Sequence, residues 1–228
     1  MAIAIGNTSG KEHENTITPS SLGHTINSGS NRILAVAVSE RNVGSSQGVT
    51  FNGVAMTKLV EQVSQLSADW KLTWWYMLES QLPAGGAYNI AYTNGGDSRA
   101  FGQMFAHCFS NVQQTAPFVY DSDNTTNSNY SRSITLNNLR NGDGILFAST
   151  INRNTDTWVA ATDYTTWFSG ANDGAPSDLP SSSTGIRRIV TASGNYTANS
   201  TRTSGSGFVT SAALAFHPAF RPKIIMTM

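Results

Sequence analysis

The 228-residue chain carries few charged residues and no net charge, which narrows the range of partners it can have. Charged residues make up 12% of the sequence, against about 25% in typical globular domains, and Ser, Thr and Asn together make up about a third of it. Nucleic acid and anionic membrane surfaces are bound through clustered Lys and Arg, so the composition argues against both as partners.

The longest apolar run, Ile33 to Val38, is far shorter than the roughly 20 residues that a membrane span requires. The single cysteine, Cys108, rules out an internal disulfide, and the paired Cys and His of zinc sites are missing from the sequence. We therefore expect a fold held together by packing and hydrogen bonds, without a cofactor.

Strand patterns recur along the whole chain, and no amphipathic helix of three turns is visible. The pattern is either a buried apolar run or an alternation of apolar and polar residues, bounded by Gly, Asn, Ser and Pro. The segments that show it are 31–40, 48–60, 69–80, 87–93, 99–110, 133–139, 145–151, 158–168, 185–193 and 206–217.

The sequence Asn52-Gly53 separates two apolar arms within 48–60. A two-residue type I′ turn needs positive φ at both positions, which Asn and Gly tolerate, so this dipeptide predicts a tight β-hairpin.

These patterns predict an all-β protein: an antiparallel β-sandwich, jelly-roll-like or immunoglobulin-like, with about ten strands. Because no repeat of fixed period and no linker is apparent, we expect one sandwich over residues 31–219. Residues 1–30 would form an N-terminal arm with a first strand, and residues 220–228 a C-terminal tail.

Trp74 and Trp75 are neighbours on a predicted strand, so their side chains point to opposite faces of the sheet. Either one of them leaves the core or both faces of that sheet are covered, as happens in an oligomer interface.

Cys108 follows His107 directly, which raises the question of a nucleophile and its base. The alternation over 99–110 indicates a strand, so the two side chains would point apart and could not share a proton. The small and apolar residues around Cys108 favour a buried, unreactive thiol.

Other catalytic and metal-binding patterns are weak. Ser46 lies in a Gly-x-Ser-x-Gly sequence, but a strand follows it where a hydrolase would have a helix. Asp121, Asp123 and Asn124 offer oxygen ligands, although the spacing is not that of an EF-hand loop. A looser calcium site shared with Asp173 or Asp178 competes with the ordinary use of such residues in turns. We expect no enzymatic activity.

Four aromatic residues near a long polar loop, Trp158, Tyr164, Trp167 and Phe168, are candidates for contact with a ligand or surface glycan. Aromatic faces with Asn and Asp neighbours can stack on a sugar ring. The alternative is that these side chains anchor the core, as large aromatics usually do.

The segments "NRILAVAVS", "VTFNGVAMTKL", "WWYMLESQLPAGGAYNIAYT", "NVQQTAPF" and "SAALAFHPA" occur in an order that resembles a β-sandwich module of tailed-bacteriophage virion proteins and bacterial surface proteins. The resemblance covers about residues 31–219 and carries no catalytic residues. It implies a structural or adhesive role, either as a capsid decoration protein or as a carbohydrate- or receptor-binding module of a tail or fibre. The location would be the virion surface, and the partners capsid or other virion proteins.

Both ends of the chain are apolar. Ile3 and Ile5 share one parity near the start, and Ile224, Ile225 and Met226 lie near the end. Exposed apolar ends on a chain without net charge favour association, so these five residues are predicted assembly contacts in a homo-oligomer or particle.

Overall fold

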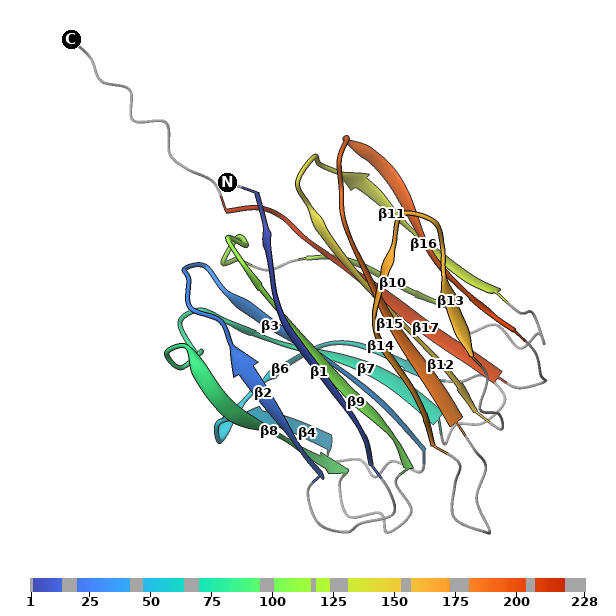
Figure 1. Ribbon diagram of the computed structural model, residues 1–228, viewed down its shortest axis with the longest axis horizontal. Helices are drawn as coiled ribbons and strands as arrows, with labels where there is room; N and C mark the ends of the chain where they lie inside the picture. Colours follow the sequence, from blue (N-terminus) through green and yellow to red (C-terminus); the bar gives the residue numbers. More distant parts are fainter. Residues whose placement is uncertain are drawn as a thin grey trace.

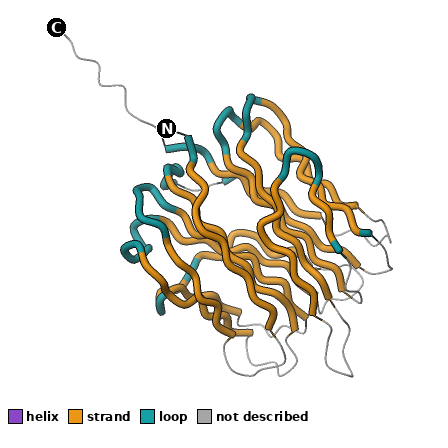
Figure 2. Tube along the Cα trace, in the orientation of Figure 1, coloured by secondary structure: helices purple, strands orange, loops and turns teal. Residues whose placement is uncertain are grey.

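The computed structural model describes residues 2–13, 20–41, 47–63, 70–94, 101–115, 118–123, 131–152, 157–172, 181–203 and 208–219. Within these ranges all regular structure is β-strand (Figure 2). Every strand pairing is antiparallel. The predicted all-β sandwich class is confirmed, and the described part of the chain holds seventeen strands in place of about ten.

The strands form four sheets (Figure 1). The first outer sheet has the order β2 (Ser20–Ile26), β8 (Gly86–Asn94), β4 (Gln47–Phe51), β5 (Val54–Ala55). The first inner sheet has the order β1 (Ala4–His13), β9 (Phe101–Ser110), β3 (Ile33–Arg41), β7 (Trp70–Leu78), β6 (Thr57–Val63). The second inner sheet has the order β10 (Val119–Asp123), β17 (Phe208–Phe216), β12 (Gly144–Asn152), β15 (Ser181–Ile189), β14 (Thr165–Asn172). The second outer sheet has the order β11 (Ser131–Leu139), β16 (Gly194–Arg202), β13 (Trp158–Ala160).

The three largest buried clusters of the described residues hold these four layers together. One lies between the two sheets of the first half and includes Val36 and Phe51. Another joins the two inner sheets and includes Trp74 and Phe216. The last lies between the two sheets of the second half and includes Phe147. Each inner sheet is therefore covered on both faces, which explains the continuous apolar runs of its central strands.

The first and second halves of the chain have the same topology. The first inner sheet has the order β1-β9-β3-β7-β6, and the second has the order β10-β17-β12-β15-β14. In each sheet, the strands that come from the same place along their half of the chain occupy the same position. The outer sheets correspond likewise, β2-β8-β4 with β11-β16-β13, except that the two-residue strand β5 of the first has no counterpart in the second. The described residues thus form two sandwiches packed through their inner sheets, and β1 and β2, from the first thirty residues, belong to the first of them.

Residues at equivalent positions touch each other across the interface between the sandwiches. Ser39 and Thr150 are each the seventh residue of their strands, and the Ser39 hydroxyl donates to Thr150 Oγ1 at 2.7 Å. Phe109 and Phe216 are opposite the first residues of β3 and β12, and their ring centroids are 5.8 Å apart. Such self-matching contacts are characteristic of a two-fold symmetric interface.

Trp74 and Trp75 show why this arrangement matters for the core. Trp74 is fully buried between the sandwiches, whereas Trp75 is buried in the core of the first sandwich. Both faces of the strand are therefore covered by this same chain, and a second chain is not needed to bury either indole.

Candidate functional site

Cys108 and His107 point to opposite faces of β9, as the alternation predicts. The Cys108 thiol is buried in the core of the first sandwich, and burial raises its pKa to about 11. His107 lies between the sandwiches, where its Nδ1 donates to the Cys108 carbonyl at 3.0 Å and its Nε2 accepts from Arg187 at 2.8 Å. Burial and the Arg187 charge lower the His107 pKa to about 3. The pair is structural, and its geometry does not allow a thiol and its base.

The four predicted glycan-contact aromatics are not gathered in one place. Trp167 and Phe168 pack between the sandwiches, where the Phe168 ring stacks on Phe105 with centroids 4.5 Å apart. The Trp167 ring lies 5.4 Å from that of Phe105 and covers Gly185, whose missing side chain leaves room for it.

Trp158 and Tyr164 are used elsewhere in the second sandwich. Trp158 is buried beside Val209 and donates from Nε1 to the Ser182 hydroxyl at 3.0 Å. Tyr164 packs on the core of the second sandwich, with the Arg188 guanidinium 5.5 Å from its ring centroid. All four aromatics have packing roles inside the chain.

The predicted assembly residues divide into buried, exposed and undescribed positions. Ile3 is 6% exposed and packs in the core between the sandwiches. Ile5 is 47% exposed on β1, which pairs with β9 at the edge of the first inner sheet. Ile224, Ile225 and Met226 lie outside the described residues. Of the five, Ile5 is the one that the structure presents to solvent.

The described residues hold no cluster of three or more His, Cys, Asp or Glu that could bind a metal ion. Asp121 is exposed, and its Oδ1 accepts from the backbone N–H of Ser122 at 2.8 Å. The side chain of Asp123 and the whole of Ser46, Asn124, Asp173 and Asp178 lie outside the described part of the chain.

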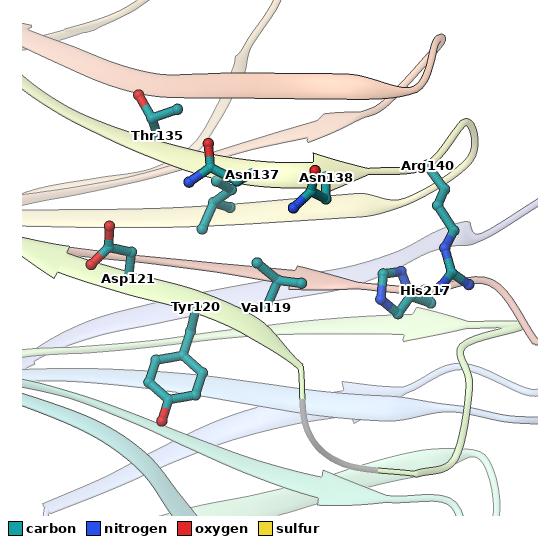
Figure 3. Close-up of a pocket in the computed structure, with 9 residues that line it drawn as sticks. Val119, Tyr120, Asp121, Thr135, Asn137, Asn138, Arg140 and His217 are labelled. Carbon is teal, nitrogen blue, oxygen red and sulfur yellow. The ribbon is translucent and has the colours of Figure 1, made fainter.

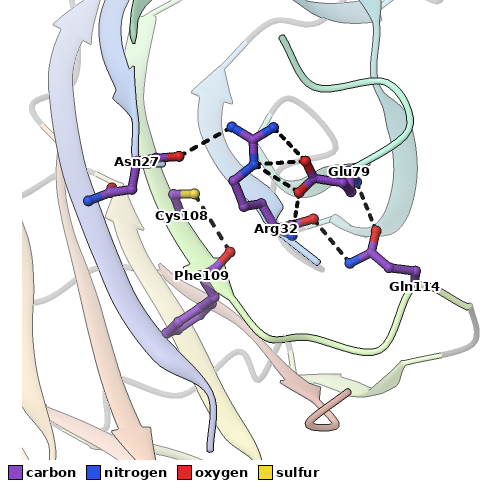
Figure 4. A network of polar contacts seen from close by, with 6 residues as sticks. All are labelled: Asn27, Arg32, Glu79, Cys108, Phe109 and Gln114. Carbon is purple, nitrogen blue, oxygen red and sulfur yellow. Dashed lines mark hydrogen bonds and ion pairs between the residues drawn. The ribbon is translucent and has the colours of Figure 1, made fainter. Parts of the chain in front are cut away.

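A network of hydrogen bonds among Arg32, Glu79 and Gln114 joins the segment between the two sandwiches to the first sandwich (Figure 4). The Arg32 guanidinium donates to both carboxylate oxygens of Glu79, with the shortest contact at 2.6 Å. Gln114, in the segment that links β9 to β10, donates to the Arg32 carbonyl and accepts from the Glu79 N–H. These bonds raise the pKa of Arg32 and lower that of Glu79.

A groove of about 470 Å³ lies between the edge strands β10 and β11 of the second sandwich (Figure 3). Val119 and Leu136 supply its apolar part, and polar groups follow β11 in a row toward His217. The residues that line it are Val119, Tyr120, Asp121, Thr135, Leu136, Asn137, Asn138, Arg140 and His217.

A β-bulge aims the amides of the groove. The register between β11 and β16 shifts between Leu136 and Leu139, and Asn138 adopts φ 59°, which an Asn tolerates better than most residues. The Asn138 N–H is bound by Asn195 Oδ1 at 3.0 Å. As a result Asn137 and Asn138 both present exposed side chains on the same stretch of strand.

Buried Asp143 holds the far end of the groove in place. One carboxylate oxygen accepts from the Arg140 N–H at 2.8 Å, and the other lies 2.9 Å from His217 Nδ1. Asp143 occupies the position of Arg32 in the other sandwich, directly before the equivalent strand. Equivalent positions in the two sandwiches therefore both make side-chain hydrogen bonds, but one is a guanidinium and the other a carboxylate.

Sequence reasoning missed this groove. A signal exists in "SITLNNL", because Ile134 and Leu136 alternate while Leu139 breaks the parity, which is what a bulge does. That β10 lies beside β11 could not be predicted from the local sequence, since these strands belong to different sheets.

Comparisons with protein-family models, curated proteins and solved structures find no match to this chain. Among the described residues, no helix is long and apolar enough to cross a membrane.

Proposed function

We propose that this chain is a non-enzymatic structural protein of a virion surface that acts as a capsid decoration protein. The observation that carries the proposal is the continuous core between the two sandwiches, in which Trp74, Phe105 and Phe216 are completely buried. Close packing of this kind makes the two sandwiches one stiff block. A stiff block suits a part that braces neighbouring shell subunits, and the resemblance of residues 31–219 to virion modules points the same way.

Ile5 is the described candidate for contact with the shell or a neighbouring copy, because it is a large apolar side chain exposed on an edge strand. Val159 is also an apolar side chain exposed on an edge strand, at 54%, but in the second outer sheet, so it provides a matched control for the loss of exposed apolar surface in general.

The alternative function is a carbohydrate- or receptor-binding module of a tail or fibre. The sequence pattern assigns its ligand contacts to Trp158, Tyr164, Trp167 and Phe168. These side chains are occupied by packing, so that function requires a different site.

The test is whether particles made from the genome that encodes this chain contain it and depend on it. Purified virions should carry the chain in amounts comparable to the major shell protein. Shells that lack it should break at a lower temperature, and added full-length chain should restore their resistance.

Ile5→Asn should bind such shells more weakly, by about tenfold for a well-buried contact, whereas Val159→Asn should bind like the natural chain. Absence of the chain from purified virions would contradict the proposal, and so would shells whose heat resistance does not change when it is added.

A further inference from the structure

The two sandwiches provide an internal comparison for the groove, because the same pair of edges exists in both. In the first sandwich, the edges of β1 and β2 are tied together by side chains. The Asn7 N–H donates to Asn27 Oδ1 at 2.7 Å, Ser9 Oγ is 2.8 Å from His24 Nδ1, and Lys11 donates to the Ser21 carbonyl. These bonds hold the two edges against each other.

The strand registers identify the equivalent residues in the second sandwich. Ser9 pairs with Ala106 on β9, and Asp121 pairs with Ala213 on β17. Ala106 and Ala213 occupy equivalent positions of their strands, so Asp121 is the equivalent of Ser9. His24 pairs with Tyr88 on β8, and Leu136 pairs with Tyr196 on β16. Each tyrosine is the third residue of its strand, so Leu136 is the equivalent of His24. The hydrogen-bonded pair of Ser9 and His24 is therefore replaced by a carboxylate and a leucine.

This replacement removes the hydrogen bond that joins the first pair of edges. A carboxylate gains nothing from Leu136 and would lose its hydration by moving onto it, so Asp121 remains exposed at the rim. The groove between β10 and β11 thus lies where the first sandwich has its Ser9–His24 hydrogen bond.

The chemistry of the lining identifies the class of ligand. Asp121 can accept hydrogen bonds, Asn137 and Asn138 can both donate and accept, and Arg140 can donate. Val119, whose side chain is partly exposed, lies beside them and can cover the C–H face of a ring. Hydroxyl groups around an apolar ring face are the pattern of a sugar.

We propose that the groove between β10 and β11 binds a neutral oligosaccharide. The charges of Asp121 and Arg140 balance, which disfavours sulfated or acidic sugars. The polar groups follow the length of β11, which suits a chain of several sugar rings (Figure 3). The volume of about 470 Å³ is within the usual range of ligand sites. This binding goes beyond the decoration role and does not depend on it.

The experiment is a titration of the full-length, isotopically labelled chain followed by NMR. The probes are cellohexaose, maltohexaose, mannohexaose and chitohexaose, with a heparin-derived hexasaccharide as the acidic comparison. At least one neutral probe should shift the side-chain amide signals of Asn137 and Asn138 with a dissociation constant in the millimolar range or below. No shift with any neutral probe, or stronger binding of the heparin fragment, would overturn the proposal.

Two variants test the site itself. Asp121→Ala should weaken the binding of that probe about tenfold or more, because a charged hydrogen bond is lost. Asn89→Ala, at an exposed asparagine on β8, is the control and should leave it unchanged. Undiminished binding by Asp121→Ala would show that the sugar binds elsewhere.

The double variant Asp121→Ser, Leu136→His rebuilds the pair that closes the first sandwich. It should abolish binding while its spectrum keeps the dispersion of a folded protein. Full binding by this double variant would also overturn the assignment. Purified protein is sufficient for these measurements, so their result is separate from whether the chain is found on virions.

Discussion

Glu40 lies on β3 with a completely buried side chain, and its carboxylate oxygens have no hydrogen-bond partner among the described residues. Lys71 is opposite it on β7, and Glu61 and Lys58 on β6 are the other charged groups that act on it. Burial raises the Glu40 pKa well above 4.5, and the Lys71 charge only partly opposes this. The folded protein therefore favours the neutral carboxylic acid.

Glu40→Gln should stabilise the protein at neutral and alkaline pH. Because the folded-state pKa is raised, the favourable contribution of Glu40 is complete below the unfolded value of 4.5 and is lost as the pH rises through the folded value. An amide avoids the cost of ionising a buried group, so we expect a gain of about 1 to 3 kcal/mol in unfolding free energy at high pH and little change in acid. Urea titrations across pH measure this.

Glu79→Gln is the control with the opposite sign. The hydrogen bonds from Arg32 lower the Glu79 pKa, so its contribution is present above 4.5 and is lost as the pH falls through the folded value. This variant should be less stable than the natural chain at neutral pH. If Glu40→Gln were also less stable there, Glu40 would be ionised and held by Lys71, contrary to the prediction.

At the scale of elements, the hairpin between β4 and β5 follows its local sequence closely. Phe51 pairs with Val54 across a two-residue turn, and Asn52 and Gly53 have φ values of 49° and 78°. These are the positive values of a type I′ turn, so the predicted hairpin is confirmed.

Gly53→Val should destabilise the protein by about 1 to 3 kcal/mol, because a β-branched residue is strained at positive φ. The space around Gly53 is open, so backbone strain alone is responsible. Gly48→Val is the matched control, since Gly48 on β4 also has open space but no positive φ. Thermal melting of both variants decides the matter, and equal melting temperatures would contradict the explanation.

At the scale of the whole molecule, the two sandwiches depend on each other for burial. Phe105 on β9 is completely buried between them, with its ring centroid 4.5 Å from Phe168 and 6.4 Å from Trp74. If either sandwich unfolded alone, the inner sheet of the other would lose the cover of one face.

Phe105→Ala should cost about 3 to 5 kcal/mol and should leave a single unfolding transition for the whole chain. Tryptophan fluorescence and far-UV circular dichroism should therefore give the same midpoint. Tyr120→Ala, at a side chain 47% exposed, should change that midpoint little. Two separate transitions in the natural chain would show that the sandwiches are independent.

The strands could be predicted because their pattern is local, whereas the two-sandwich arrangement could not. Trp74 is equivalent to Gly185, and Phe105 to Ala212, so matching positions differ greatly in size. A large residue on one side of the interface fits a small one on the other, and packing conserves their combined volume but not their identity. Differences of this size at the interface make the correspondence between the halves hard to recognise from the sequence.

The candidate site was still less predictable. Their place near a polar loop suggested that Trp158 and Trp167 contact a ligand. Instead Trp167 fills the space over Gly185, and Trp158 donates a hydrogen bond to the hydroxyl of Ser182. The groove depends on which residues face each other across two sheets, such as Asp121 and Leu136, and that is fixed only by tertiary structure.

The contacts between equivalent residues, Ser39 with Thr150 and Phe109 with Phe216, also bear on ancestry. A half-length chain that paired with a copy of itself through this sheet would make contacts of the same kind, so duplication and fusion of one gene would account for them. In such a pair every substitution at the pairing face would occur twice, and a larger residue would meet itself. In a single chain the two positions vary independently, so one half can carry Trp74 while the other carries Gly185 at the same position.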